Sequence, residues 1–163
     1  MFNVFNKAKL QKDDLKGIAK LMYQDVFNDS WDKENLTKRN LDFTIESVRY
    51  IDMYTKRLMG TEFGTELLSK HFDNLVLRIG AYVGEVIKSN VNQDYHWYKS
   101  DSVENYSPNL NELHSVNKTQ SVLYSKKKDK VILPLSIVSK LLKGNCQYSN
   151  LLTYVEEMIK QNS

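Results

Sequence analysis

The longest apolar pattern in the chain lies near its centre. Large apolar residues recur there every three or four positions, the spacing that lines one side of an α-helix: Leu68, Phe72, Leu75, Ile79, Val83 and Val86. Gly80 and Gly84 stand one turn apart in the same run. Because glycine inside a helix costs about 0.5–1 kcal/mol relative to alanine, this pair indicates that another element packs its backbone closely against the helix. We therefore expect a central, mostly buried helix within residues 62–89.

Two further helices are predicted before the central one. Apolar residues mark one face of residues 13–27, where Asp13 or Asp14 can cap the first turn. Residues 42–59 repeat the helical spacing, and Gly60 supplies a residue that commonly closes a helix. Between these helices, residues 28–35 are polar and rich in turn-forming types around Trp31. We expect a loop there, anchored by the indole.

The pattern changes after residue 90. Residues 94–99 alternate aromatic and polar side chains as a half-buried strand does, whereas residues 100–119 predict a loop with a short helical turn at 110–114. Two β-rich runs, 120–125 and 131–134, flank a charged tip and predict a hairpin that Pro134 closes. A short helix over 135–142 stopped by Gly144, and a last helix capped by Ser149, complete the chain. The fold class predicted is α+β, with a helical N-terminal half, a small antiparallel sheet and C-terminal helices.

Composition and length narrow the class of protein. The 163 residues are 41% hydrophobic and 26% charged, which is typical of one folded domain. Arg78, Glu85 and Lys88 interrupt the central apolar run well short of the ~20 residues that a membrane span needs. Cys146 is the single cysteine, which fits a reducing compartment, and residues 1–7 lack the apolar run of a signal peptide. We expect a cytoplasmic protein that does not associate with membranes.

Several residues suggest chemistry, and each has a simpler structural explanation. Glu85 lies two turns after Arg78, but a buried structural partner explains it better than a catalytic acid. The three histidines, His71, His96 and His114, are scattered without the spacing of a helical metal site. Cys146 lies in a polar turn without a nucleophile signature. No phosphate-binding glycine loop or nucleophile elbow is found. We expect no enzyme, no cofactor and no metal.

The aromatic strand and the lysine-rich tip allow a binding role. Tyr95, Trp97 and Tyr98, followed later by lysines at 126–128, have the composition that stacks bases and neutralises single-stranded nucleic acid. The simpler interpretation is a strand that packs its aromatic rings on the central helix, with a solvated tip that protects a sheet edge. A net charge of +3, spread along the chain, does not favour a general nucleic-acid surface.

Taken together, five stretches resemble a group of small bacterial proteins that are uncharacterised or of the immunity type. They are LDFTIESV at 41–48, GAYVGEVI at 80–87, Trp97, VILPLSIVSK at 131–140, and Gly144. The likeness spans about residues 41–160, so we interpret residues 1–40 as a helical N-terminal extension of a single domain over 1–163. The resemblance implies an α+β cytoplasmic protein without known catalysis, which in several lineages neutralises a secreted or injected toxin.

The first functional hypothesis is therefore a non-enzymatic immunity protein that binds one cognate bacterial toxin. A basic nuclease toxin would favour an acidic surface on its inhibitor, since opposite charges steer association. The candidate partner-binding residues lie in and after the aromatic strand: Asp94, Tyr95, Trp97, Asp101, Glu104 and Glu112. The alternative hypothesis is a nucleic-acid-binding or regulatory module that uses the aromatic strand and the lysine tip. The pattern leaves the oligomeric state open.

Overall fold

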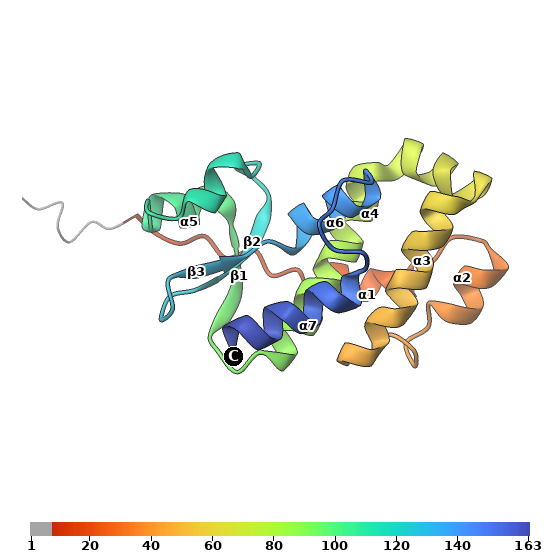
Figure 1. Ribbon diagram of the computed structural model, residues 1–163, viewed down its shortest axis with the longest axis horizontal. Coiled ribbons are helices and arrows are strands. Elements are labelled where there is room, and N and C mark those ends of the chain that lie inside the picture. The colour runs from red at the N-terminus through yellow and green to blue at the C-terminus, as the bar shows by residue number, and fades with distance from the viewer. Residues whose placement is uncertain (1–7) are drawn as a thin grey trace, which may run out of the picture. The chain divides into compact units, whose positions relative to one another are not determined.

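A computed structural model describes residues 8–163 and divides the chain into two compact units (Figure 1). The sheet unit comprises residues 8–14 and 93–133, and the helical unit comprises residues 15–92 and 134–163. Each unit is thus built from segments distant in sequence. The interpretation of residues 1–40 as an extension of a single domain with a core over 41–160 stays a prediction. Helices together with a small antiparallel sheet confirm the predicted α+β class.

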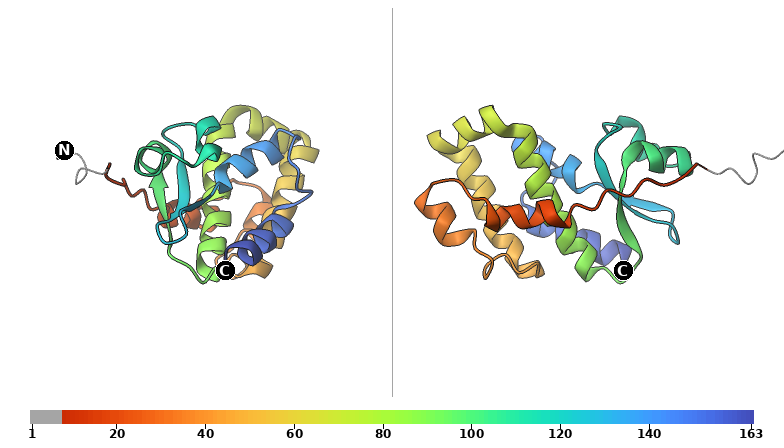
Figure 2. Two further views of the ribbon diagram at one scale, coloured as in Figure 1. Left: turned by 60° about the vertical axis from the view of Figure 1, so that its left-hand side comes forward. Right: turned by 180° about the vertical axis from the view of Figure 1, so that it is seen from behind.

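The long helix α4 is the centre of the helical unit. It runs over Glu62–Asn90, close to the predicted range, and α1, α3, α6 and α7 all pack against it (Figures 1 and 2). The other elements of the unit are α1 (Lys16–Gln24), α2 (Ser30–Asn35), the 3-10 helix η2 (Ile45–Ser47), α3 (Val48–Gly60), α6 (Pro134–Leu142) and α7 (Leu151–Asn162).

Two glycines of α4 allow close packing of helices. A side-chain Cβ at Gly80 would lie 2.8 Å from the Leu135 side chain and 3.0 Å from its Cα, so α6 crosses α4 closely at this point. This confirms the close approach predicted from Gly80. A Cβ at Gly64 would lie 2.2 Å from the Arg57 carbonyl oxygen, which shows how tightly the first turn of α4 folds back on α3. Between them, non-helical backbone at His71 kinks α4.

Side chains cap some of the helices, but several predicted ends are wrong. Neither Asp13 nor Asp14 caps α1, whose N-cap is Leu15 without a side-chain hydrogen bond, and α3 begins at Val48 rather than near 42. The Thr61 hydroxyl accepts from the Gly64 amide at 3.0 Å and starts α4. At α7 the cap is Asn150, not Ser149, because the Asn150 side chain accepts from the Thr153 amide at 2.8 Å. Pro134 begins α6 instead of closing a strand, since its missing N–H is harmless in a first helical turn.

The polar stretch at 28–35 is a helix where a loop was predicted. Its N-cap, Asp29, accepts a hydrogen bond from the Asp32 amide at 3.0 Å and so stabilises the short helix α2. Trp31 stacks parallel to Tyr54 of α3, with ring centres 6.4 Å apart, and the Arg57 guanidinium lies 5.0 Å from the indole. The Trp31 indole therefore anchors this segment as predicted, but the segment is a helix rather than a loop.

The sheet unit holds three antiparallel strands in the order β1-β2-β3. β1 (Tyr95–Lys99) pairs with β2 (Ser121–Ser125), which pairs with β3 (Lys130–Ile132) across the predicted hairpin. The helix α5 (Ser100–Tyr106), which was predicted as loop, and the 3-10 helix η3 (Asn111–Ser115) follow β1. Their apolar side chains cover one face of the sheet and form a buried cluster with Tyr98, Val122 and Tyr124.

Residues 11–13 lie along the outer edge of β1, which the sequence pattern did not predict (Figure 2). Lys12 and Tyr98 form an antiparallel bridge, and the Lys99 amide donates to the Gln11 carbonyl at 2.9 Å. The Asp13 amide in turn donates to the Trp97 carbonyl at 3.1 Å. The N-terminal segment therefore protects an edge that would otherwise present unpaired backbone groups.

Candidate functional site

The structure buries two of the six residues predicted to bind a partner. Tyr95 and Trp97 are 1% and 2% exposed, so their rings lie in the protein interior and are not on the surface where we predicted a partner to bind. Asp94 is engaged by the hairpin, since its carboxylate accepts from the Ser125 hydroxyl and, at 3.4 Å, from the Lys127 amide. Desolvation raises the pKa of Asp94, but these hydrogen bonds together outweigh it and hold the pKa below the ordinary value.

The other three predicted residues lie on α5 and η3, two neighbouring elements. Glu112 is exposed, whereas Asp101 and Glu104 are half-buried. Glu104 lies 3.6 Å from the His114 ring nitrogen and forms an ion pair whenever that histidine is protonated. One surface of the sheet unit thus carries these carboxylates, and their role in partner binding stays a prediction.

The remaining candidates take structural positions. Glu85 is buried in α4 with its carboxylate 3.7 Å from the Lys88 ammonium, whereas Arg78 binds the Asp25 carboxylate at 2.7 Å. The Cys146 sulfur accepts from the Tyr148 amide at 3.4 Å. Over residues 8–163 no group of three or more histidine, cysteine or acidic side chains is placed to hold a metal ion.

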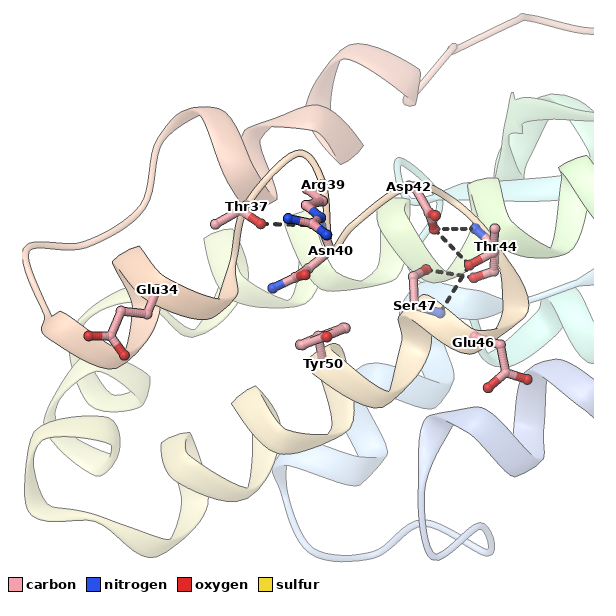
Figure 3. Close-up of a pocket in the computed structure, with 9 residues that line it drawn as sticks. All are labelled: Glu34, Thr37, Arg39, Asn40, Asp42, Thr44, Glu46, Ser47 and Tyr50. Atoms are coloured by element: carbon pink, nitrogen blue, oxygen red, sulfur yellow. Dashed lines mark hydrogen bonds between the residues drawn. The ribbon is translucent and has the colours of Figure 1, made fainter.

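A spacious pocket lies in the helical unit, where the chain passes from α2 to α3 (Figure 3). It has a volume of about 680 Å³ and opens broadly to solvent. Glu34 comes from α2, Tyr50 comes from α3, and the connecting segment and η2 supply the rest of a polar lining: Thr37, Arg39, Asn40, Asp42, Thr44, Glu46 and Ser47. In Figure 3 the Asn40 amide and the Tyr50 ring lie between Glu34 on one side and Glu46 on the other.

A compact hydrogen-bond network shapes the wall of this pocket where α3 begins. The Asp42 carboxylate accepts from the Thr44 hydroxyl at 2.6 Å and from the Thr44 amide at 3.2 Å. The Thr44 hydroxyl caps η2 by accepting from the Ser47 amide at 3.2 Å. Phe43, between them, has a left-handed backbone with φ 64°. The network compensates for this uncommon conformation and fixes where Asp42 points.

Tyr82 of α4 makes hydrogen bonds to this network. Its hydroxyl lies 2.7 Å from the Ser47 hydroxyl and accepts from the Phe43 amide at 3.0 Å, while its ring stacks on Phe43 with centres 4.7 Å apart. Burial raises the pKa of Tyr82 to about 12, so the hydroxyl keeps its proton at neutral pH. The central helix thereby holds the pocket wall rigid.

The lining is acidic. Three carboxylates, from Glu34, Asp42 and Glu46, stand against one guanidinium, from Arg39. Hydrogen bonds from Thr44 hold the pKa of Asp42 below its ordinary value, and Glu46 makes an exposed ion pair with Arg49 at 3.3 Å. Carboxylate and hydroxyl oxygens of this kind accept hydrogen bonds from a guanidinium or ammonium group. The pocket is therefore suited to a basic side chain.

Sequence reasoning missed this pocket, although one local signal pointed to part of it. The spacing Asp42, Thr44, Ser47 is a turn and capping signature ahead of a helix. It predicts where a helix starts, but not that Glu34 and Asn40 line the same pocket. That arrangement depends on the path of residues 36–41 and on Tyr82, which comes from a distant part of the chain.

A second cluster of charged groups lies on the other side of α2. Asp32 is only 2% exposed, and its Oδ2 has no hydrogen-bond partner among the described residues. Burial, and then the neighbouring Asp29 carboxylate, raise the pKa of Asp32 to about 7, although Arg57 opposes the rise. Arg57 also pairs with Asp29 at 3.4 Å. Two cavities of about 10 Å³, each large enough for one water molecule, adjoin Asp32.

In the described part of the chain, no helix is both long and apolar enough to cross a bilayer. The likeness to immunity-type proteins stays a prediction. In comparisons with protein-family models, curated proteins and solved structures, the chain has no match.

Proposed function

We propose that the protein acts by binding another protein, a bacterial toxin that it neutralises, and that the acidic pocket of the helical unit receives basic side chains of that partner. The observation that carries the proposal is the pocket lining, which includes three carboxylates and one guanidinium and has one wall fixed by hydrogen bonds. A prearranged wall lowers the entropy lost on binding. Tyr50 adds an aromatic ring of the type that dominates interface energies.

This role needs complementary shape and charge rather than catalytic groups. A toxin that acts on nucleic acid carries a basic surface, and an acidic receptor steers its approach and blocks the surface that it needs. The exposed carboxylate Glu112 and the half-buried Glu104, in the sheet unit, can contribute a second contact area. The resemblance to immunity-type proteins supports the same class of function.

The test is affinity purification with tagged protein from its source cells, comparing three double variants. E34K/E46K reverses the charge of two carboxylates that line the pocket. E104K/E112K reverses the charge of the two carboxylates in the second contact area, on the sheet unit. D73K/E156K changes the same number of exposed carboxylates on other parts of α4 and α7 and serves as the matched control. Melting curves of all variants verify that each is folded.

We expect wild type and D73K/E156K to retain one larger protein in stoichiometric amounts, and E34K/E46K to retain at least tenfold less. Repulsion between like charges at an interface costs several kcal/mol, which is enough for this loss. The recovered protein is then assayed for toxicity with and without the wild-type chain. Retention of no protein, or equal retention by E34K/E46K and wild type, would overturn the proposal.

A further inference from the structure

A basic groove lies in the sheet unit, separate from the acidic pocket. Residues 8–12 form one side of it as they run beside β1, and the start of the hairpin tip forms the other. Its volume is about 420 Å³. We call it the lysine groove, and its lining residues are Ala8, Lys9, Leu10, Lys12, Tyr98, Tyr106 and Lys126.

The charge in this groove has one sign. Three lysines line it and no carboxylate does, and all three lysines are exposed. Three more exposed lysines follow on the same hairpin: Lys127, Lys128 and Lys130. Of these six lysines, none lies within ion-pair distance of a carboxylate in the part of the chain that the structure describes.

Two acidic residues close to the hairpin lysines, Asp94 and the exposed Asp129, accept hydrogen bonds from neighbouring groups. Asp129 accepts from the Ser107 and Tyr124 hydroxyls, each at 2.6 Å, and Asp94 accepts from the Ser125 hydroxyl. Both carboxylate oxygens of Asp94 and the Oδ1 of Asp129 accept hydrogen bonds within the unit, while the hairpin lysines are exposed to solvent. The pattern of charges over the whole chain, which is nearly balanced, conceals this local excess.

An aromatic ring stands in the groove beside the lysines. Tyr106 is half-buried and packs edge to face on Tyr124, with ring centres 6.1 Å apart, so its ring is held in place. The Lys126 ammonium lies 6.0 Å from the centre of the same ring. Tyr98 is nearly buried and forms the floor. A fixed ring next to cations is how proteins hold a base and its phosphate together.

We propose that the lysine groove binds single-stranded nucleic acid, with the backbone phosphates on Lys9, Lys12 and Lys126 and one base against Tyr106. This activity is independent of the proposed toxin binding, because it uses other residues in the other unit. A duplex is a poor ligand for this site, since its bases are stacked on one another and offer no free face to Tyr106. The predicted role of Tyr95 and Trp97 in stacking is replaced by Tyr106, because the first two are buried.

The experiment measures binding of the protein to a labelled oligothymidylate of 12 nucleotides by fluorescence anisotropy, at NaCl concentrations between 50 and 200 mM. With three phosphate contacts the logarithm of affinity falls with a slope of about −2 against the logarithm of salt concentration, so affinity drops roughly 20-fold over this range. K9A/K126A removes two of these contacts, so we expect about tenfold weaker binding at 100 mM NaCl and a shallower slope. K33A/K118A removes two exposed lysines elsewhere and should bind like wild type.

Two further measurements separate stacking from charge. Y106L should weaken binding at least fivefold with an unchanged salt slope, whereas Y106F, which keeps the ring, should bind like wild type. Melting curves verify that Y106L is folded. A labelled poly-glutamate of 12 residues carries comparable charge without bases and should bind at least tenfold more weakly. No saturable binding at 50 mM NaCl, equal affinities of K9A/K126A and K33A/K118A, or equal binding of poly-glutamate would each overturn the proposal.

Discussion

Replacing Asp32 by asparagine should change how the stability of the protein depends on pH. The pKa of this carboxyl is 3.8 when solvated and about 7 in the folded chain, chiefly because the group is buried. In that interval the folded state holds a proton that the unfolded state has lost, so the free energy of unfolding decreases as pH rises. Each pKa unit corresponds to about 1.4 kcal/mol, so complete ionisation of Asp32 costs at most about 4 kcal/mol.

The D32N substitution puts an amide at this position, which is neutral at every pH and has an N–H donor for the Asp29 carboxylate. We therefore expect D32N to gain stability relative to wild type as pH rises, by up to about 2.5 kcal/mol between pH 5 and pH 8. The stability gained by D32N should be smallest at pH 4 and below, where the wild-type carboxyl is protonated in the folded state. Below about pH 4 Asp32 no longer makes the free energy of unfolding depend on pH, because the carboxyl is protonated in both states.

The assay is urea unfolding at pH 5, 6, 7 and 8, followed by circular dichroism. D73N, which neutralises an exposed carboxylate of α4, is the control for a change of net charge. The carboxyl resonance of Asp32 in NMR spectra reports its titration directly. Parallel pH profiles of D32N and wild type, or a resonance that titrates near pH 4, would show that the carboxyl is not held protonated by its surroundings.

Three other substitutions test the packing of the helical unit. Gly64→Ala should destabilise the protein by about 3 kcal/mol, because a Cβ would lie 2.2 Å from the Arg57 carbonyl oxygen and backbone would have to move. Gly17→Ala, where nothing lies within 4 Å, should instead stabilise it by up to about 1 kcal/mol. Tyr82→Phe should cost about 1–3 kcal/mol, because the hydroxyl contacts a serine and a backbone amide beneath the acidic pocket. Urea unfolding measures all three, and an unchanged midpoint for Gly64→Ala or Tyr82→Phe would contradict the packing described.

The parts of the fold that could be predicted are those whose signal is local. The three- and four-residue spacing around Leu75 and Ile79 located α4 to within a residue or two, and the β-rich runs at 120–125 and 131–134 located the hairpin. Polar segments were harder. The helix α2 has too few apolar residues to show a period, and it forms because Asp29 caps it and Trp31 packs on α3.

The candidate sites could not be predicted in the same way, because each combines distant segments. The acidic pocket depends on Tyr82 and residues 34–50, which are neighbours only after α4 packs on the α2 to α3 segment. The lysine groove depends on residues 8–12 lying beside β1, about 90 positions later in the chain. The lysines of the hairpin tip could be recognised in the sequence. The stacking ring could not, because we predicted that Tyr95 and Trp97 stack bases, and both are buried, whereas Tyr106 lines the groove.

The insertion of residues 93–133 between α4 and α6 has a consequence for synthesis on the ribosome. The nascent chain makes α1, α3 and α4 first, but α6 and α7, which pack on α3 and α4, emerge only after the whole strand segment has been translated. Until then the face of α4 around Gly80 lacks its cover, and the Asp52 carboxylate lacks the amides of Leu151 and Leu152 that it binds at 2.7 and 3.0 Å. The helical unit therefore stays incomplete during translation, with apolar surface exposed, which is the period when a chaperone would protect it.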